Sequence, residues 1–323
     1  MKMKHVFTLA GAVMATALWM LPGVASAQNR IFVGTVAGSD LDGLARRVAE
    51  VLAASDGSRW IVENRPGSGG ALGFDALKGA APDGTTLLMA PSGALTLAPH
   101  TRPNLKYSLA DVAPVSRVAA FDVAYVASAK VPATTLKAYF EWVKQDKSRA
   151  IFATPQFGGI PHMFGIKLGR AAGVPLDNAP YRGGGSQLIT DVVGGHVLAA
   201  SSGVAEWLRE HQAGTVRILA TSGTKRAPQL PDVPTFQELG YKDLTASIAY
   251  LLLAPASTPK ATIDTISARV AKGLTDPKLR ESITSQGFVV DGTTAPSTVA
   301  TDLRAEHKLW GDLIKDTGFK MTQ

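Results

Sequence analysis

The stretch VAPVSRVAAFDVAYVAS, residues 112–128, is one of two long β-type segments in this chain of 323 residues, and it decides the fold. The second segment, TASIAYLLLAPAS, follows much later, at residues 245–257. Both are apolar and rich in residues that favour strands. Two such segments that bracket an inserted region are typical of a two-lobed protein whose chain crosses between its lobes twice.

Shorter β-type runs alternate with helical patterns around these segments. The alternation predicts an α/β fold around a mostly parallel sheet. Apolar residues spaced three and four apart from Leu41 to Leu52 mark one face of a helix. The tail, residues 259–317, is expected to form two amphipathic helices around a short strand and to return to the first lobe. Further strands are expected at 31–36, 60–64, 85–90, 150–154, 196–201 and 216–222, and further helices at 70–80, at 134–146 and from about 161.

The first 27 residues have the pattern of a secretory signal peptide. Lys2 and Lys4 precede an uncharged apolar run at residues 6–21, and the sequence ASA at 25–27 matches a cleavage site. The apolar run is too short for a comfortable membrane span. We therefore expect a soluble, exported protein, and we exclude this segment from the fold.

Composition and charge exclude several classes of function. The chain contains no cysteine, which excludes disulfides, thiolate metal sites and a cysteine nucleophile. The signal segment contains two lysines and no acid, so its removal leaves 31 Lys plus Arg against 26 Asp plus Glu, a net charge of +5. This mild excess favours anionic ligands. Nucleic-acid binding needs clustered basic residues, and the longest cluster, Lys225-Arg226, is only a pair, so no nucleic-acid partner is expected.

The domain organisation follows from length and from the two long segments. The 296 residues after the signal segment exceed the size at which one core stops growing, so two lobes are expected. We expect lobe 1 to comprise residues 28–122 and 248–323, and lobe 2 to comprise residues 123–247.

The stretch VENRPGSGGALG, residues 62–73, is close to the glycine pattern of a dinucleotide-binding loop. However, it follows the second expected strand instead of the first, and residues 63–66 intervene where glycines should follow the strand directly. No acid follows the third expected strand to bind a ribose hydroxyl. A Pro-Gly turn whose glycines let a helix start close to the sheet is therefore the favoured interpretation.

The usual sequence marks of catalysis are missing. The six histidines, at positions 5, 100, 162, 196, 211 and 307, include no His-Glu-x-x-His pair, and the chain has no Gly-x-Ser-x-Gly elbow and no P-loop. We therefore expect no metal site and no cofactor. A secreted enzyme that acts on a small organic acid stays open as an alternative, because catalytic residues can converge from distant parts of a chain.

Four loops join the end of an expected strand to the start of a helix, where N–H groups lack partners and the helix dipole is positive. Two belong to lobe 1 and two to lobe 2, so they would meet a carboxylate from both sides. Each loop has a simpler interpretation as a helix cap or a turn. Likewise, Asp42 and Arg46 have a simpler interpretation as an i,i+4 ion pair on the surface. Together they predict ligand contacts from Val36, Ala37, Gly38, Ser39, Asp40, Ser92, Gly93, Thr154, Gln156, Phe157, Gly158, Gly159, His162, Arg182, Gly183 and Gly184.

Several stretches match a known family over nearly the whole chain. They are VAGSDLDGLARR, VENRPGSGGALG, APDGTTLL, FATPQFGGIPHMFG, APYRGGGSQLITDVVGGHV, VRILATSGTKRAPQLPDVPTFQELG and LAPASTPK. The chain resembles the Bug-type extracytoplasmic solute receptors, the binding proteins of tripartite tricarboxylate transporters. The resemblance implies a two-lobed periplasmic binding-protein fold (type II-like) with two crossover segments, which closes on a small organic carboxylate without catalytic turnover. It also implies a periplasmic monomer whose partners are the membrane subunits of such a transporter or a sensor kinase.

Some positions depart from the family pattern. Where the family usually has an aromatic residue and a second glycine in the first loop, this chain has Thr35 and Ser39. In the second lobe Pro155 removes a hydroxyl group and Gln156 replaces a glycine. These departures fall at ligand-facing positions, so the family's usual substrate does not transfer to this chain.

Two residues indicate the kind of ligand. Phe157 makes one wall more apolar, and Arg182 is able to pair with a carboxylate through two hydrogen bonds. They favour a ligand with an apolar or aromatic body and one or two carboxylates. The alternative for Phe157 is that it packs under its own loop.

Overall fold

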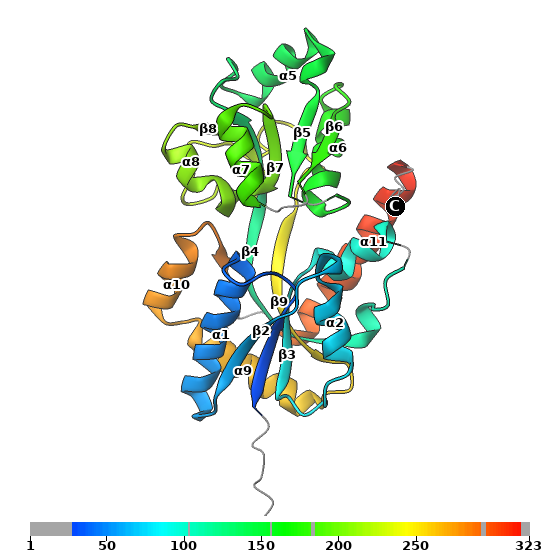
Figure 1. Ribbon diagram of the computed structural model, residues 1–323, viewed down its shortest axis with the longest axis vertical. Helices are drawn as coiled ribbons and strands as arrows, with labels where there is room; N and C mark the ends of the chain where they lie inside the picture. The colour runs from blue at the N-terminus through cyan, green and yellow to red at the C-terminus, as the bar shows by residue number, and fades with distance from the viewer. Residues whose placement is uncertain (1–27, 103, 156, 182–184, 292–294, 318–323) are drawn as a thin grey trace, which may run out of the picture.

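The computed structural model describes residues 28–317, except residues 103, 156, 182–184 and 292–294. Two lobes lie one above the other along the long axis of the molecule, and two extended strands run between them (Figure 1). These strands are β4 (Val112–Ser128) and β9 (Ser247–Pro255), which correspond to the two long β-type segments of the sequence. The predicted α/β fold with two crossover segments is confirmed.

The strands of the described residues form one mixed sheet. Lobe 1 contains β1 (Asn29–Val33), β2 (Trp60–Asn64), β3 (Thr86–Pro91) and β10 (Val289–Val290), and lobe 2 contains β5 (Ile151–Thr154), β6 (Asp177–Pro180), β7 (Ala199–Gly203) and β8 (Val216–Thr221). The strand order is β2-β1-β3-β9-β4-β7-β5-β6, with β8 and β10 also paired to β4.

The prediction of a mostly parallel sheet holds only inside each lobe. There, β1 is parallel to β2 and β3, and β5 is parallel to β6 and β7. The crossover strands are antiparallel to each other and to their neighbours β3, β7 and β8. The reason is that the chain leaves lobe 1 through β4 and returns through β9, so these strands run in opposite directions.

Strand β4 changes its partner half-way along. Residues up to Asp122 pair with β9, whereas residues from Val123 onward pair with β7. Asp122 lies opposite Ser247, in the last pair of the ladder between β4 and β9. The domain boundaries at 122/123 and 247/248 stay predictions, and the first coincides with this change of partner.

Helices pack on the sheet through the apolar faces that the sequence predicts. In α1 the residues spaced three and four apart from Leu41 to Leu52 are buried. The other helices of lobe 1 are α2 (Ala71–Lys78), α3 (Gly93–Thr96), α4 (Ala98–Thr101), α9 (Lys260–Gly273), α10 (Pro277–Thr284) and α11 (Pro296–Thr317), and α1 is Asp40–Asp56. Lobe 2 contains α5 (Leu136–Lys144), α6 (Ile160–Ala171), α7 (Gly185–Gly194) and α8 (Leu208–Gln212).

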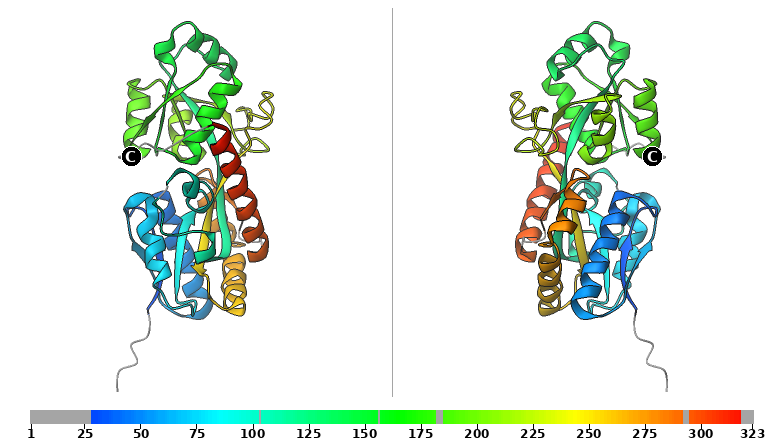
Figure 2. Two further views of the ribbon diagram at one scale, coloured as in Figure 1. Left: turned by 90° about the vertical axis from the view of Figure 1, so that its right-hand side faces the viewer. Right: turned by 90° about the vertical axis from the view of Figure 1, so that its left-hand side faces the viewer.

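The C-terminal region corrects one prediction. It forms three helices, α9, α10 and α11, where the sequence predicted two. The missed helix, α10, begins separately because the Asp276 side chain accepts the N–H of Leu279 at 2.8 Å and Pro277 occupies the first turn. As expected, the region returns to lobe 1: β10 pairs with Ala119 and Ala120 of β4, and α11 lies along one side of that lobe (Figure 2).

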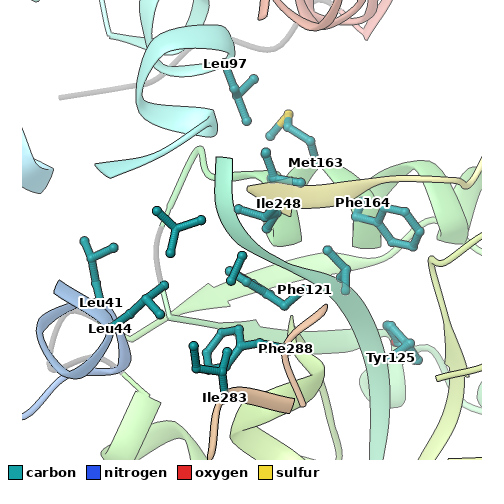
Figure 3. Close-up of a cluster of buried hydrophobic side chains, with 14 of the residues drawn as sticks. Leu41, Leu44, Leu97, Phe121, Tyr125, Met163, Phe164, Ile248, Ile283 and Phe288 are labelled. Carbon is teal, nitrogen blue, oxygen red and sulfur yellow. The ribbon is translucent and has the colours of Figure 1, made fainter. Parts of the chain in front are cut away.

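The largest apolar core continues from lobe 1 through the crossover strands into lobe 2 (Figure 3). At the crossing, the ring of Phe121 lies 5.1 Å from that of Tyr250 and 5.8 Å from that of Phe288, measured between centroids. Buried aromatic pairs of this geometry stabilise by about 0.5–1.5 kcal/mol beyond their area burial. Aromatic side chains thus pack against one another where the crossover strands join the two lobes.

Candidate ligand-binding site

The predicted loops lie where the two lobes face each other. In each lobe a helix begins directly after a parallel strand: α1 follows β1, α6 follows β5 and α7 follows β6. Parallel α/β units place such loops at one edge of the sheet, where ligands bind. The edges of both lobes are directed toward the boundary between them (Figure 1). We call residues 34–39 the α1 loop and residues 155 and 157–159 the α6 loop.

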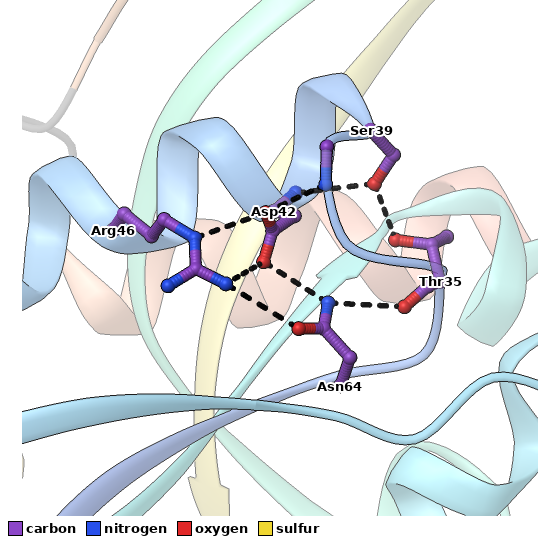
Figure 4. A network of polar contacts seen from close by, with 6 residues as sticks. Thr35, Ser39, Asp42, Arg46 and Asn64 are labelled. Atoms are coloured by element: carbon purple, nitrogen blue, oxygen red, sulfur yellow. Dashed lines mark hydrogen bonds and ion pairs between the residues drawn. The ribbon is translucent and has the colours of Figure 1, made fainter.

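Asp42 organises the α1 loop (Figure 4). Its carboxylate accepts the Gly38 N–H at 2.9 Å, two bonds from Arg46 at 2.9 and 3.0 Å, and one from Asn64 at 3.0 Å. Burial raises the pKa of Asp42, but the hydrogen bonds from Arg46, Gly38 and Asn64 together lower it below its usual value. The side chain of Asp42 is 4% exposed, so the pair with Arg46 is more than the surface pair weighed from the sequence.

The helix cap completes this loop. The Ser39 hydroxyl accepts the Asp42 N–H at 3.3 Å and lies 2.7 Å from the Thr35 hydroxyl. Gly38 has a φ of +81°, which favours glycine. Val36, Ala37, Gly38 and Asp40 are exposed on this fixed loop, and Val36 is 63% exposed.

The VENRPGSGGALG stretch contacts the α1 loop and helps to fix its conformation. Asn64 at the end of β2 donates to the Thr35 carbonyl at 3.1 Å as well as to Asp42. Gly70 precedes α2 with a φ of +94°, and a Cβ on Gly34 would lie 2.7 Å from the Gly70 Cα. The glycines therefore form a turn and a helix start that packs closely on the first strand, as favoured from the sequence.

A buried histidine fixes the α6 loop. The Gly158 N–H donates to Nδ1 of His162 at 2.9 Å, and burial lowers the pKa of His162 to about 4. The imidazole is therefore neutral near pH 7, with Nδ1 as acceptor. His162 is 2% exposed, so it positions the loop from the interior, and the ring of Phe157 lies 4.7 Å from it.

Other predicted residues lie inside the protein or at the contact between lobes. Thr154 is buried, with its hydroxyl 2.9 Å from Nδ2 of Asn178. The Ser92 hydroxyl faces Glu306 of α11 at 3.3 Å, within lobe 1. A Cβ on Gly93 would lie 3.0 Å from Cδ1 of Ile160, so Gly93 abuts the first residue of α6.

The lobes touch near the α6 loop. The Thr101 hydroxyl of α4 donates to the Gly158 carbonyl at 3.4 Å. The structure thus brings the α6 loop, its helix start and Gly93 together, and places the α1 loop on the opposing edge. Gln156, Arg182, Gly183 and Gly184 lie outside the described residues.

Two further residues belong to this region and were missed from the sequence. Glu206 lies in a 3₁₀ helix, η4 (Val204–Trp207), directly after β7, and Tyr250 lies in the crossover strand β9. Burial raises the pKa of Glu206 to about 7; the Ser202 hydroxyl lowers it in part and the charge of Asp40 raises it. Burial also raises the pKa of Tyr250, and the charges of Asp40 and Glu206 add to this effect. The available signal for Glu206 was an acid shortly after the strand expected at 196–201.

Neither of two other kinds of site, a metal site or a surface depression, is found in this region among the described residues. In the part of the chain that the structure describes, no group of three or more His, Asp or Glu residues is placed to hold a metal ion. A surface depression lined in part by Asn29, Trp60, Thr262 and Arg269 lies at the amino ends of β1 and β2, far from the helix starts.

Comparison with known proteins identifies the family. Residues 44–319 match the model of the family described as "Tripartite tricarboxylate transporter family receptor". The chain belongs to this family. BugT of Bordetella pertussis is 29% identical over 286 residues, which cover 88% of this receptor and 87% of BugT. A protein of Agrobacterium vitis, from the TAR-I ttuE-ttuC' intergenic region, is 30% identical over 317 residues, which cover 95% of the receptor and 91% of that protein.

Solved structures agree with this assignment. The periplasmic binding protein BugD is 28% identical, with a TM-score of 0.80 over 91% of the receptor and 99% of BugD. MatC of Rhodopseudomonas palustris, solved with bound malate, is 25% identical, with a TM-score of 0.78 over 89% and 98% of the two chains. The receptor is therefore a periplasmic solute-binding protein, and the predicted Bug-type fold is confirmed. In its described residues no helix has the length and apolarity needed to span a membrane.

Proposed function

We propose that this receptor binds a small organic carboxylate between its lobes and delivers it to the membrane subunits of a tripartite tricarboxylate-type transporter. Family membership supports the transporter, and the malate bound to MatC, at 25% identity, supports a carboxylate. A sensor kinase as an alternative partner, a monomeric state and a cleavable signal peptide stay predictions.

The observation that carries the proposal is the pair of rigid helix starts, α1 and α6, on the facing edges of the two lobes. The N–H groups of Gly38 and Asp42 are used inside the α1 loop, so those of Asp40 and Leu41 are the first-turn donors that we propose for a carboxylate. On the other side, Gly159 and Ile160 begin α6 ahead of Pro161, which has no N–H to offer. A carboxylate between them would receive hydrogen bonds from both lobes, and lobe closure would remove competing water.

The proposed function is binding without turnover. The Ser92 hydroxyl lies beside a carboxylate, that of Glu306 at 3.3 Å, but Ser92 is buried in the protein. His162 is committed to the Gly158 N–H and is buried, which leaves it poorly placed as a general base. The alternative, a secreted enzyme that acts on an organic acid, makes a different chemical prediction.

A thermal-shift screen of organic acids on the mature chain tests both possibilities, with malate as the first probe. A ligand at about 100 times its Kd should stabilise the fold by about 2.7 kcal/mol. For a protein of this size that raises the Tm by roughly 5–10 °C. The acid should then be recovered unchanged by mass spectrometry. If no acid stabilises the protein, or if the stabilising acid is converted, binding without turnover is wrong.

Arg182 offers a side-chain test of the same proposal. From the sequence we propose that its guanidinium pairs with a ligand carboxylate. Arg182→Ala should then weaken calorimetric binding of the stabilising acid at least tenfold. An unchanged affinity would remove Arg182 from the site while leaving the proposed function intact.

A further inference from the structure

Three polar groups from three parts of the fold converge between the lobes. Asp40 is the first residue of α1 in lobe 1, Glu206 follows β7 in lobe 2, and Tyr250 lies on the crossover strand β9. The charges of Asp40 and Glu206 both act on the Tyr250 hydroxyl, and that of Asp40 acts on Glu206, so the three are within electrostatic reach of one another. Only Asp40 was predicted from the sequence.

The carboxyl group of Glu206 is held in a narrow space. A Cβ on Gly185, the first residue of α7, would lie 2.9 Å from Oε2, and a Cβ on Gly203 would lie 3.6 Å from Oε1. The ring of Phe121 lies on the same side, 2.8 Å from that Gly203 position. A larger residue at either glycine would occupy the space beside the carboxylate.

Oε2 of Glu206 is buried and has no hydrogen-bond partner among the described residues. A buried oxygen of this kind costs about 1–3 kcal/mol when it is left unpaired, and more when it carries a charge. Most buried polar atoms in proteins have a partner. An unpaired carboxylate oxygen at the boundary between two lobes therefore indicates a donor that a ligand supplies.

Among the described residues, the causes of the pKa shifts of these two carboxyl groups include no positive charge. Asp40 is exposed, yet desolvation by the surrounding protein raises its pKa. Two acids of like charge in a partly desolvated region are destabilised when both ionise, and a cation between them relieves this.

We propose that Glu206, with Asp40 facing it across the lobes, accepts the protonated amino group of the ligand, so the receptor selects amino carboxylic acids over the same acids without the amine. The inference rests on the proposed function, because the helix starts hold the carboxylate while Glu206 and Asp40 hold the ammonium. An ammonium group has three N–H donors. They match Glu206 Oε2, the Asp40 carboxylate and, as third acceptor, the Tyr250 hydroxyl oxygen.

Matched probe pairs test the inference by titration calorimetry on the mature chain. The pairs are aspartate and succinate, glutamate and glutarate, and phenylalanine and 3-phenylpropionate, which differ only by the amine. In at least one pair we expect the amino acid to bind at least tenfold more tightly. Glu206→Gln should reduce that ratio at least tenfold, and Asp40→Asn should reduce it less. Glu50→Gln, an exposed acid on the outer part of α1, is the matched control and should leave the ratio unchanged.

The direction of the pH dependence gives an independent readout. Glu206 has a raised pKa, and the titratable groups that face it are Asp40 from α1 and Tyr250 from β9. An ammonium favours ionised Glu206, so amino-acid affinity should rise between pH 6 and pH 8, and this rise should be absent in Glu206→Gln. An acid without the amine should show the opposite trend.

The outcomes separate the two proposals. Binding of carboxylates with equal affinity for both members of every pair, or a ratio that Glu206→Gln leaves intact, overturns this inference and leaves the proposed function standing. If neither these probes nor any acid of the thermal-shift screen binds, both proposals are wrong.

Discussion

Replacement of Asp42 by asparagine is expected to loosen the start of α1, with losses of stability and of ligand affinity. The carboxylate accepts bonds from Gly38, Arg46 and Asn64, and it is nearly fully buried. Asparagine has almost the same shape but one acceptor oxygen, so it loses either the bonds from Gly38 and Arg46 Nε or those from Arg46 Nη2 and Asn64. The substitution therefore removes the charge and at least one bond that holds the α1 loop.

The magnitude follows from burial and exposure. Hydrogen bonds to a charged group contribute about 1.5–3 kcal/mol, and loss of one partner of a buried pair costs roughly 3–5 kcal/mol. Here the Arg46 side chain is 50% exposed and regains water when the pair is lost, which reduces the cost. We expect a loss of about 2 kcal/mol, or a decrease in Tm of roughly 4–8 °C for a protein of this size.

The matched control is Asp264→Asn. Asp264 also forms an i,i+4 ion pair, with Lys260 on α9, but its side chain is 48% exposed. An exposed pair contributes about 0.3–0.5 kcal/mol, so the control should change the Tm by less than about 2 °C. Thermal denaturation at pH 7 and calorimetric titration of a bound acid measure both effects. Equal Tm values for the two variants would show that Asp42 does not organise the loop.

A pH series adds an internal check on this reasoning. The folded-state pKa of Asp42 is lowered, so the ionised form stabilises the protein above its unfolded-state pKa near 4. This contribution is lost as the pH falls through the lowered pKa. The difference in stability between the wild type and Asp42→Asn should therefore shrink below about pH 4.

Three further predictions concern the site and its support. His162 has a folded pKa of about 4, below its ordinary value of 6.5, so stability should fall by up to about 3 kcal/mol as the pH falls from 6.5 through 4; thermal melts should show less of this loss in His162→Gln. Glu206 has a raised folded pKa of about 7, so its contribution to stability is lost as the pH rises from about 4.5 through 7; without ligand, Glu206→Gln should gain stability over the wild type across that interval, and a constant difference would contradict this. Gly34→Ala should destabilise by about 1–3 kcal/mol because the new Cβ meets the Gly70 backbone, whereas Gly43→Ala, where the nearest such atom is the Arg47 Nη1 at 3.8 Å, should be neutral or stabilising in urea unfolding.

The fold was largely predictable because local patterns agree with the global arrangement. The two long β-type segments became the crossover strands, and the apolar face of α1 became its buried face. The mixed direction of the sheet was not predictable from periodicity, since alternation of strands and helices does not show which strands return between lobes. The break before α10 was missed although Asp276 and Pro277 form a helix-start signal that the sequence contains.

The helix starts of the candidate site were predictable because they depend on features that are local in the sequence. Small residues after a strand mark a helix start, and this placed the α1 and α6 loops between the lobes. The role of His162 depends on a bond from Gly158, in the loop before its helix, and the sequence suggested only that the residue was near the ligand. Ser92 follows a strand as well, but its hydroxyl turns to Glu306 on α11, more than two hundred residues away. Contacts of that range leave no local pattern in a single sequence.

Asp40 and Asp42 are both aspartates of the first turn of α1, but they differ in role because their surroundings differ. Asp42 points into the loop, where its carboxylate meets donors from three residues and its pKa is lowered. Asp40 is exposed, and desolvation by the surrounding protein raises its pKa. The carboxylate of Asp42 is satisfied within the protein and therefore stabilises the empty receptor. In our proposal the carboxylate of Asp40 receives the ammonium group of the ligand, so it contributes to selectivity in place of stability.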